Sequence, residues 1–231
     1  MQSRNGATPD TEAQRVYRSL KRDILAAAFA PGQPLAETAL SQHYGASRTP
    51  PREALQKLNG DGLVRIEPRR GAFVQELTVT DFLEINELRS ILEPHAARLA
   101  ARRISPEELD QLTITLAAIS PTAPADDDSR RLQKLDSDVH AAIAQASGNS
   151  RLYRLIHSLD DMMQVMRVSD MRRRHRETHE SLGEILAALA ARDPDTAEAA
   201  LRRHISDFRG AIAHGDERRP AAGWAPSNPM T

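Results

Sequence analysis

The hydrophobic residues in the first third of the chain are spaced as in amphipathic helices and, further on, as in a hairpin. Val16, Leu20 and Ile24 lie four residues apart, which places them on one helical face. Glycine or proline follows each periodic segment, and a turn containing Pro68 and Gly71 separates two short apolar runs. The predicted elements are helices at about 11–28, 36–44 and 49–59 and strands at about 63–66 and 72–75.

From residue 80 onward the strand pattern disappears and amphipathic helical segments follow one another. Short polar breaks separate them, and Asp193-Pro194 has the form of an N-cap followed by proline at the first helical position. Helices of this length joined by short loops pack as an antiparallel bundle. We expect them at about 80–102, 106–119, 128–147, 151–168, 172–192 and 194–213.

The change of pattern predicts a mainly α protein with two domains. The first is a winged helix-turn-helix of three helices plus a β-hairpin, and the second is an antiparallel all-α bundle. Both ends of the chain lack periodicity, so we expect a disordered N-terminus and a flexible C-terminal tail. The predicted boundaries are 1–10 for the N-terminus, 11–76 for the winged helix-turn-helix, 77–80 for a linker, 81–214 for the bundle and 215–231 for the tail.

Charge distinguishes the two domains, although the whole chain is nearly neutral. Its 31 Lys and Arg residues oppose 32 Asp and Glu residues, for a formal net charge of -1. Residues 1–78 hold 11 basic and 8 acidic residues, whereas the remainder holds 20 basic and 24 acidic residues. A basic first domain is compatible with binding of nucleic acid, which the neutral total would have hidden.

Cysteine is absent from the 231 residues, which excludes disulfides and leaves His and carboxylates as the metal ligands to consider. The longest uninterrupted apolar run covers residues 24–30, far too short to cross a membrane. The N-terminus has no apolar targeting segment. We therefore expect a cytoplasmic protein without a membrane partner.

Arginines stand where a recognition helix would begin. Arg48 and Arg52 are four residues apart and share a face from which guanidinium groups reach guanine edges or phosphates, and Thr49 suits a phosphate. In the hairpin turn, Arg70 supplies a cation and Gly71 lets the backbone approach closely, which suits phosphates or the minor groove. For any one of these arginines taken singly, a solvated charge or an ion pair is the alternative.

The order of these motifs resembles the GntR family of bacterial transcription regulators. That resemblance implies DNA contacts at Arg48, Thr49, Arg52 and Gly71, with Arg70 as a backbone contact. Pro51 departs from the family pattern, which usually has an aliphatic residue there, so we expect the N-cap to move to Thr49 and Pro51→Val to tighten operator binding. The matching segments are Val16-Tyr17 to Ile24, Pro31-Gly32, Leu35-Ala36-Glu37, Ser47-Arg48-Thr49-Pro50-x-Arg52-Glu53-Ala54-Leu55, Gly62-Leu63-Val64 and Arg70-Gly71-Ala72-Phe73-Val74.

Three predicted helices of the bundle carry ionisable residues in or beside their apolar faces, which is costly unless these groups are paired or bind a metal. Asp136 and His140 lie four residues apart, and His179 and His204 interrupt the apolar faces of the last two helices. An Asp with several imidazoles suits zinc, nickel, manganese or iron. A hydrogen-bonded Asp136–His140 pair and a satisfied core His204 are the metal-free alternative.

This half resembles the ligand-binding FadR C-terminal domain, or FCD domain, of the FadR branch of the GntR family. In metal-binding members an Asp and three His hold a divalent ion, and Asp136, His140 and His204 match three of these positions. The remaining His would fall at Leu182, so His179, one turn upstream, either substitutes for it or marks an inserted turn. The matching segments are Glu87-Leu88-Arg89-x-x-Leu92-Glu93, Ala96 to Ala100, Asp136-x-x-x-His140, Ala146 to Asn149 and Ala199 to Ile205.

Arg89 stands beside apolar positions of the first bundle helix, so we expect its guanidinium to reach the bundle interior. A cation there suits a carboxylate ligand, and pairing with Glu93 or Asp136 is the alternative. With a metal beside Arg89, the implied effector is a small organic acid. A long-chain acyl effector stays open, because in the family that mode accompanies loss of metal ligands and Leu182 replaces one of them.

Together these features predict a ligand-responsive DNA-binding transcription regulator and not an enzyme. The resemblance implies a homodimer on a pseudo-palindromic double-stranded operator in the bacterial cytoplasm, acting as a repressor that a small carboxylate effector controls. One alternative is a metal-free, constitutive DNA-binding dimer. A less favoured one is a metal-dependent hydrolase, for which the sequence offers no clear general base beside the ligands.

Overall fold

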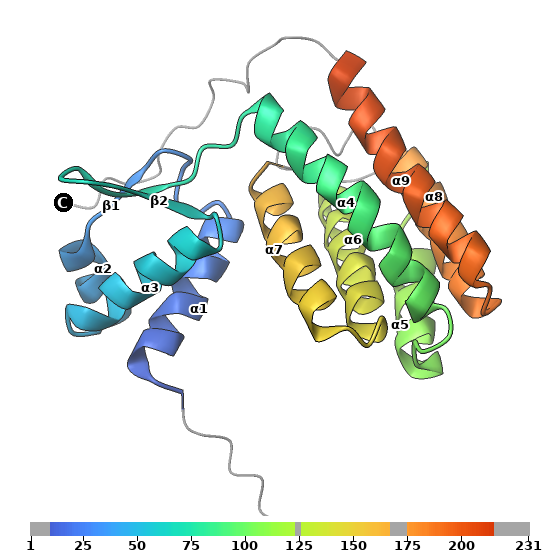
Figure 1. Cartoon of the computed structure of the whole chain (residues 1–231), viewed down its shortest axis with the longest axis horizontal. Helices are drawn as coiled ribbons and strands as arrows, with labels where there is room; N and C mark the ends of the chain where they lie inside the picture. Colours follow the sequence, from blue (N-terminus) through green and yellow to red (C-terminus); the bar gives the residue numbers. More distant parts are fainter. Residues whose placement is uncertain (1–9, 123–125, 167–174, 215–231) are drawn as a thin grey trace, which may run out of the picture. The chain divides into compact units, whose positions relative to one another are not determined.

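The structure is a computed structural model that describes residues 10–122, 126–166 and 175–214 (Figure 1). The described residues divide into two compact units, one of residues 10–82 with 158–166 and the other formed by the described residues of 83–157 and 175–214. The disordered N-terminus and the flexible C-terminal tail that we predict lie outside the described residues, apart from Asp10. The fold is mainly helical with one small sheet, as predicted.

The first unit has the predicted three helices and hairpin, with an additional short strand. Thr11 and Gln14 form a capping box that fixes the start of the first helix. The three strands are antiparallel in the order β1-β3-β2, and β1 is only two residues long, too short to show an alternating pattern. The elements are α1 (Glu12–Leu25), β1 (Pro34–Leu35), α2 (Glu37–Tyr44), α3 (Thr49–Gly60), β2 (Val64–Glu67) and β3 (Gly71–Val74).

Helix α3 accommodates two prolines in its first turn without a change in where it begins. Its N-cap is Arg48, so Pro50 and Pro51 take the second and third helical positions. The first amides of a helix have no acceptor within it, and a proline there removes no helical hydrogen bond. The expected N-cap at Thr49 is therefore wrong by one residue, and the structure removes the reason for expecting Pro51→Val to tighten operator binding.

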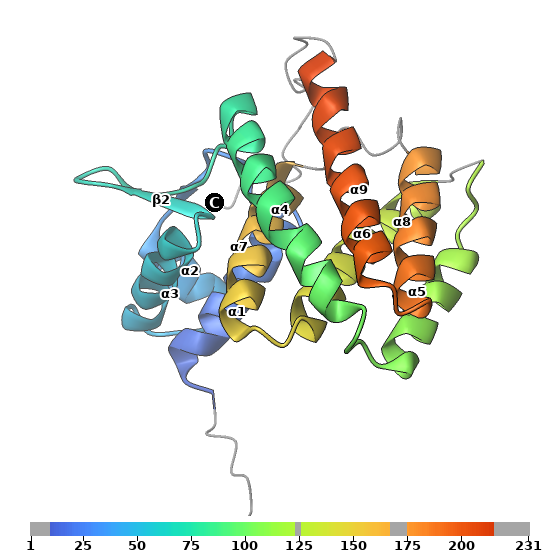
Figure 2. The same cartoon turned by 45° about the vertical axis from the view of Figure 1, so that its right-hand side comes forward.

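Within the described residues after β3, the structure has six helices, each within a few residues of its predicted range. Helix α4 begins at Val79 and thus takes up half of the expected 77–80 linker. Helix α8 contacts α5, α6 and α9, and the buried core around it is formed by Leu, Ile, Val and Ala side chains. Figure 2 shows α4 and α9 side by side. The helices are α4 (Val79–Ala100), α5 (Pro106–Ala117), α6 (Asp126–Ala146), α7 (Ser150–Met166), α8 (His175–Ala190) and α9 (Pro194–His214).

Within the described residues, every helix is too short or too polar to span a bilayer.

Candidate nucleic-acid interface and metal centre

The residues predicted to contact DNA are all exposed in the first unit. Arg48 is the N-cap of α3, Thr49 begins the helix and Arg52 follows one turn later, so the structure brings these three together at one helix end. Arg70 lies in the turn between β2 and β3, and Gly71 is the first residue of β3. Exposed cations at a helix N-terminus and exposed cations at a hairpin turn each suit contact with a polyanion.

Two glycines give this surface its backbone shape. Gly45 ends α2 in the left-handed conformation, with φ 58°, and forms the tight turn toward α3. Gly71 has φ 103° at the start of β3, directly after the hairpin turn, and an added Cβ there would meet no atom within 4 Å. The constraint at Gly71 is therefore conformational and not steric, because L-residues rarely adopt that φ.

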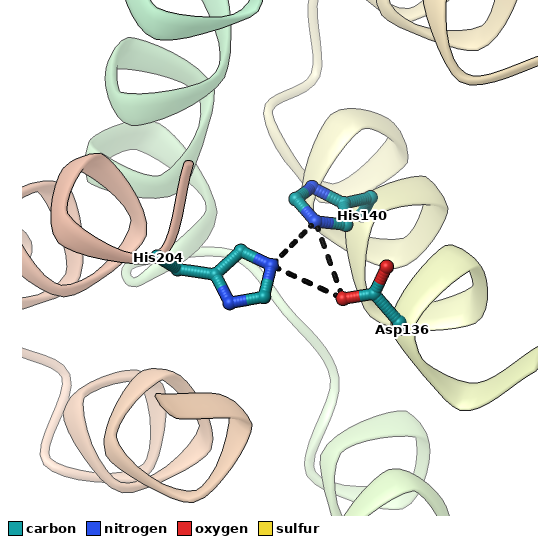
Figure 3. Close-up of side chains that lie close together, drawn as sticks. All are labelled: Asp136, His140 and His204. Carbon is teal, nitrogen blue, oxygen red and sulfur yellow. Dashed lines mark hydrogen bonds and ion pairs between the residues drawn. The ribbon is translucent and has the colours of Figure 1, made fainter. Parts of the chain in front are cut away.

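Asp136, His140 and His204 converge in the second unit (Figure 3). Asp136 and His140 are one turn apart on α6, and His204 comes from α9. His204 Nε2 lies 3.1 Å from Asp136 Oδ1 and 3.3 Å from His140 Nε2, while His140 Nε2 lies 3.7 Å from Asp136 Oδ1. Asp136 and His140 are buried and His204 is half-buried. Three potential ligand atoms therefore point at one place.

The other nitrogen of each imidazole has its own partner. His140 Nδ1 contacts Glu93 Oε2. His204 Nδ1 lies 2.8 Å from Ser181 Oγ, and the Ser181 hydroxyl lies 3.0 Å from the Thr178 carbonyl oxygen, to which it can donate. Ser181 Oγ can thus accept a hydrogen bond from His204 Nδ1–H while its own hydroxyl donates to Thr178. With both Nδ1 atoms protonated, the Nε2 lone pairs of His140 and His204 are directed at the point where they converge with Asp136 Oδ1.

Arg89 lies beside this cluster and is almost completely buried. Its Nε donates to Glu93 Oε1 at 2.5 Å, and its Nη2 is 3.2 Å from His140 Nε2. Burial raises the pKa of the Glu93 carboxyl, but the charges of Arg89 and His140 and their hydrogen bonds outweigh burial, so the pKa lies well below its usual range. Glu93 is therefore a carboxylate that anchors both a cation and an imidazole.

The electrostatics also favour a neutral His204. Burial lowers the pKa of His204 and outweighs the hydrogen bond and the attraction to Asp136, which raise it. A neutral imidazole has one ring nitrogen with a free lone pair. Through that lone pair it can coordinate a metal ion or accept a hydrogen bond.

The structure does not bring His179 to the cluster. His179 Nε2 lies 3.2 Å from the carbonyl oxygen of Leu116 and 3.1 Å from that of Ile119, at the C-terminal end of α5. Leu182, the position at which the family pattern has a histidine, is fully buried among apolar side chains of the core. The metal-ligating group found among the described residues therefore has three members and not four.

Sequence reasoning missed the roles of Glu93 and Ser181. Glu93 was recognisable as a partner of Arg89 four residues earlier on the same helix, but its contact with His140 depends on how α4 packs against α6. Ser181 gave no signal at all, because a serine on a helix is ordinary until α8 is placed beside α9.

Comparisons with known proteins match two successive parts of the chain to two family models. The sequence model described as bacterial regulatory proteins, gntR family, matches residues 12–74, and that of the FCD domain matches residues 84–207. The HTH-type transcriptional repressor RspR of Escherichia coli (strain K12) is 31% identical over 205 residues, covering 86% of this chain and 88% of that protein. The Nta operon transcriptional regulator of Aminobacter aminovorans is 30% identical over 177 residues, covering 77% and 83%.

Solved structures show the same fold. A GntR transcriptional regulator from Rhodococcus sp. RHA1 superposes with a TM-score of 0.73 at 26% identity, covering 90% of this chain and 100% of that chain. E. coli McbR/YncC superposes with a TM-score of 0.69 at 24% identity, covering 88% and 98%.

Proposed function

Because the chain belongs to the GntR family of bacterial transcription regulators and carries an FCD domain, we propose that it is a repressor that binds an operator as a homodimer and responds to a small carboxylate. Its family and its relatives are DNA-binding transcription regulators and not enzymes, which removes the hydrolase alternative. We assign it to the bacterial cytoplasm, where operator DNA is found.

The observation that carries the sensing proposal is the cluster of Asp136, His140 and His204 beside a buried Arg89. Two imidazoles and one carboxylate suit zinc, nickel, manganese or iron, and three protein ligands leave coordination positions for an exogenous oxygen ligand. The fit is supported by Glu93 and Ser181, which hold the outer nitrogens of the two rings as the partners of metal-bound histidines commonly do. A bound ion would supply a Lewis acid that takes a carboxylate oxygen.

Arg89 supports a carboxylate as the effector. Its guanidinium is held by Glu93 through Nε, and its Nη2 faces the nitrogen of His140 that points into the cluster. An anion bound beside the cluster and next to Arg89 would find both a cation and donors. We infer that a small organic acid, with one carboxylate toward the cluster and another group toward Arg89, is the effector class.

A homodimer is supported by exposed apolar side chains in the second unit. Leu88 and Ile91 lie three residues apart on α4 and are 50% and 62% exposed, and Leu155 on α7 is 56% exposed. Exposed large apolar side chains on a regulatory domain are typical of a self-association surface. A second copy of the chain is the occupant that a two-fold operator requires.

One observation favours a second candidate, the constitutive metal-free dimer. Arg89 Nη2 can donate to His140 Nε2, and the alternative tautomer of His204 can donate from Nε2 to Asp136 Oδ1. These contacts would satisfy the buried polar groups without any ion, so the cluster would be a structural network.

A thermal-shift screen separates the two candidates. Full-length protein, freed of metal by a chelator, is heated with and without zinc, nickel, manganese or iron and with a panel of small carboxylates, and release of an operator obtained by selection is followed in parallel. The sensor predicts a rise in Tm with the metal, a further rise with one acid, and altered operator affinity. Asp136→Ala abolishes the metal response, and no response in the wild-type protein supports the constitutive dimer instead.

A further inference from the structure

The hairpin that carries Arg70 and Gly71 contains a second arginine, which shares a carboxylate with the first. Glu67 Oε1 pairs with a terminal nitrogen of Arg65, and Glu67 Oε2 lies 2.5 Å from Arg70 Nη1. Arg65 also lies within 3.6 Å of Glu76 Oε2. One carboxylate thus bridges two guanidinium groups, one on strand β2 and one in the turn after it.

An aromatic ring supports both guanidinium groups. Phe73 stands opposite Arg65 in the register of β2 and β3, and its ring centroid lies 4.9 Å from Arg65 Cζ and 5.7 Å from Arg70 Cζ. A guanidinium over an aromatic ring is attracted to its face and loses some of its conformational freedom. Phe73 therefore keeps Arg65 and Arg70 turned toward the same anion, whichever anion that is.

We propose that Arg65 and Arg70 form a site for a backbone phosphate of DNA, and that Glu67 occupies this site in the free protein and is displaced on binding. A carboxylate and a phosphodiester each carry one negative charge and each accept hydrogen bonds from arginine, so one can replace the other. The side chains are reachable, because Arg70 is 72% exposed, Arg65 37% and Glu67 24%. Partly exposed ion pairs of this kind are weak enough to be exchanged.

This arrangement makes Glu67 an internal counterion of the wing, which is the hairpin formed by β2, β3 and the turn between them. Binding of DNA would exchange Glu67 for a phosphate, so the wing arginines contribute less to affinity and to its salt dependence than two unpaired arginines would. The effect weakens binding to any duplex, since a phosphate contact carries no sequence information, and leaves discrimination to the residues at the start of α3. The inference rests on the proposed contact between the wing and DNA.

The test measures binding of the full-length protein to a fluorescein-labelled duplex of arbitrary sequence by fluorescence anisotropy across a series of salt concentrations. Glu67→Gln keeps the shape of the side chain and removes its charge. We expect the slope of log K against log salt to become steeper by about 1 to 2, with affinity at low salt higher by about tenfold. Glu12→Gln is the matched control, because Glu12 pairs with Arg15 at 3.8 Å on α1, away from the hairpin.

A second substitution identifies the arginine that is released. In the Glu67→Gln background, Arg65→Gln removes most of the gain if Arg65 takes up a phosphate, and thermal unfolding of each variant shows whether the hairpin has stayed folded. The proposal is overturned if Glu67→Gln binds no more tightly than Glu12→Gln, or more weakly, since Glu67 then only orients the arginines. If Arg65→Gln, Arg69→Gln and Arg70→Gln combined in the Glu67→Gln background also leave the salt slope unchanged from that of Glu67→Gln, the wing does not touch DNA and the proposed contact itself fails.

Discussion

The two units of this regulator place their functional charges in opposite surroundings. In the first, Arg48, Thr49 and Arg52 are exposed around one helix start, where solvent and salt weaken each interaction. In the second, Arg89 and Glu93 are almost fully buried, and each needs the other. The difference teaches that substitutions of these exposed residues change binding and spare folding, whereas substitutions around the cluster change folding as well.

The largest effect should follow removal of Arg89. Arg89→Ala leaves the buried Glu93 carboxylate without its main partner, which costs about 3–5 kcal/mol of stability. Because the folded-state pKa of Glu93 is lowered, its contribution is present above its ordinary pKa of 4.5 and is lost as pH falls toward the lowered value. Urea unfolding should therefore show the largest difference between wild type and variant near neutral pH, and a smaller one in acid.

Arg203→Ala is the control for this buried pair. Arg203 and Glu184 lie 2.9 Å apart with side chains 59% and 61% exposed, so its loss should cost under about 1 kcal/mol. Equal losses for the two variants would contradict the contrast between buried and exposed charges.

The next largest effect concerns the start of α3. Arg52→Ala should weaken binding to a selected operator by about 1–3 kcal/mol at fixed salt and leave Tm nearly unchanged, because Arg52 is exposed and its role is direct contact with DNA. Anisotropy and thermal unfolding measure the two quantities on the same sample. Arg22→Ala removes one exposed cation from α1 and should change neither the affinity for the operator nor Tm. A loss of Tm in Arg52→Ala that matches its loss of affinity would argue for a structural role.

How far the sequence predicts each unit follows from the same contrast. The residues predicted to contact DNA depend on local spacing, such as Arg48 to Arg52, and on turns next to Gly45 and Gly71, so the sequence was enough to predict the elements on which they lie. It did not indicate that Glu67 bridges two arginines, because that depends on the register of the hairpin.

In the second unit the helices and the three cluster residues followed from apolar periodicity and the family motif. The partners of the two imidazoles did not, because Glu93 on α4 and Ser181 on α8 meet His140 and His204 only through packing. His179 shows the limit most clearly. A slip of one turn keeps roughly the same helical face, but it moves the ring along the axis, where the end of α5 offers carbonyl oxygens.

His179 itself gives the third prediction. His179→Ala removes a donor from two carbonyl oxygens at the end of α5 and should destabilise the protein by about 1–2 kcal/mol. Binding of manganese or zinc, measured by calorimetry on the folded variant, should match the wild type, whereas His204→Ala should lose it. Loss of metal binding in His179→Ala with unchanged stability would restore His179 as a fourth ligand.

The smallest effect is expected at Pro51, which lies in the first turn of α3 next to the predicted DNA contacts. Pro51 occupies the third position of α3, where the helix needs no amide donor and the backbone suits proline. Pro51→Val therefore restores nothing and instead frees the unfolded chain, which should cost about 0.4–1 kcal/mol of stability. Affinity for the operator at fixed salt should stay unchanged, because Arg48, Thr49 and Arg52 keep their places. Tighter binding by Pro51→Val would show that the second proline distorts the recognition helix. In that case, DNA affinity in the first unit would depend on the backbone of α3 as well as on its exposed side chains.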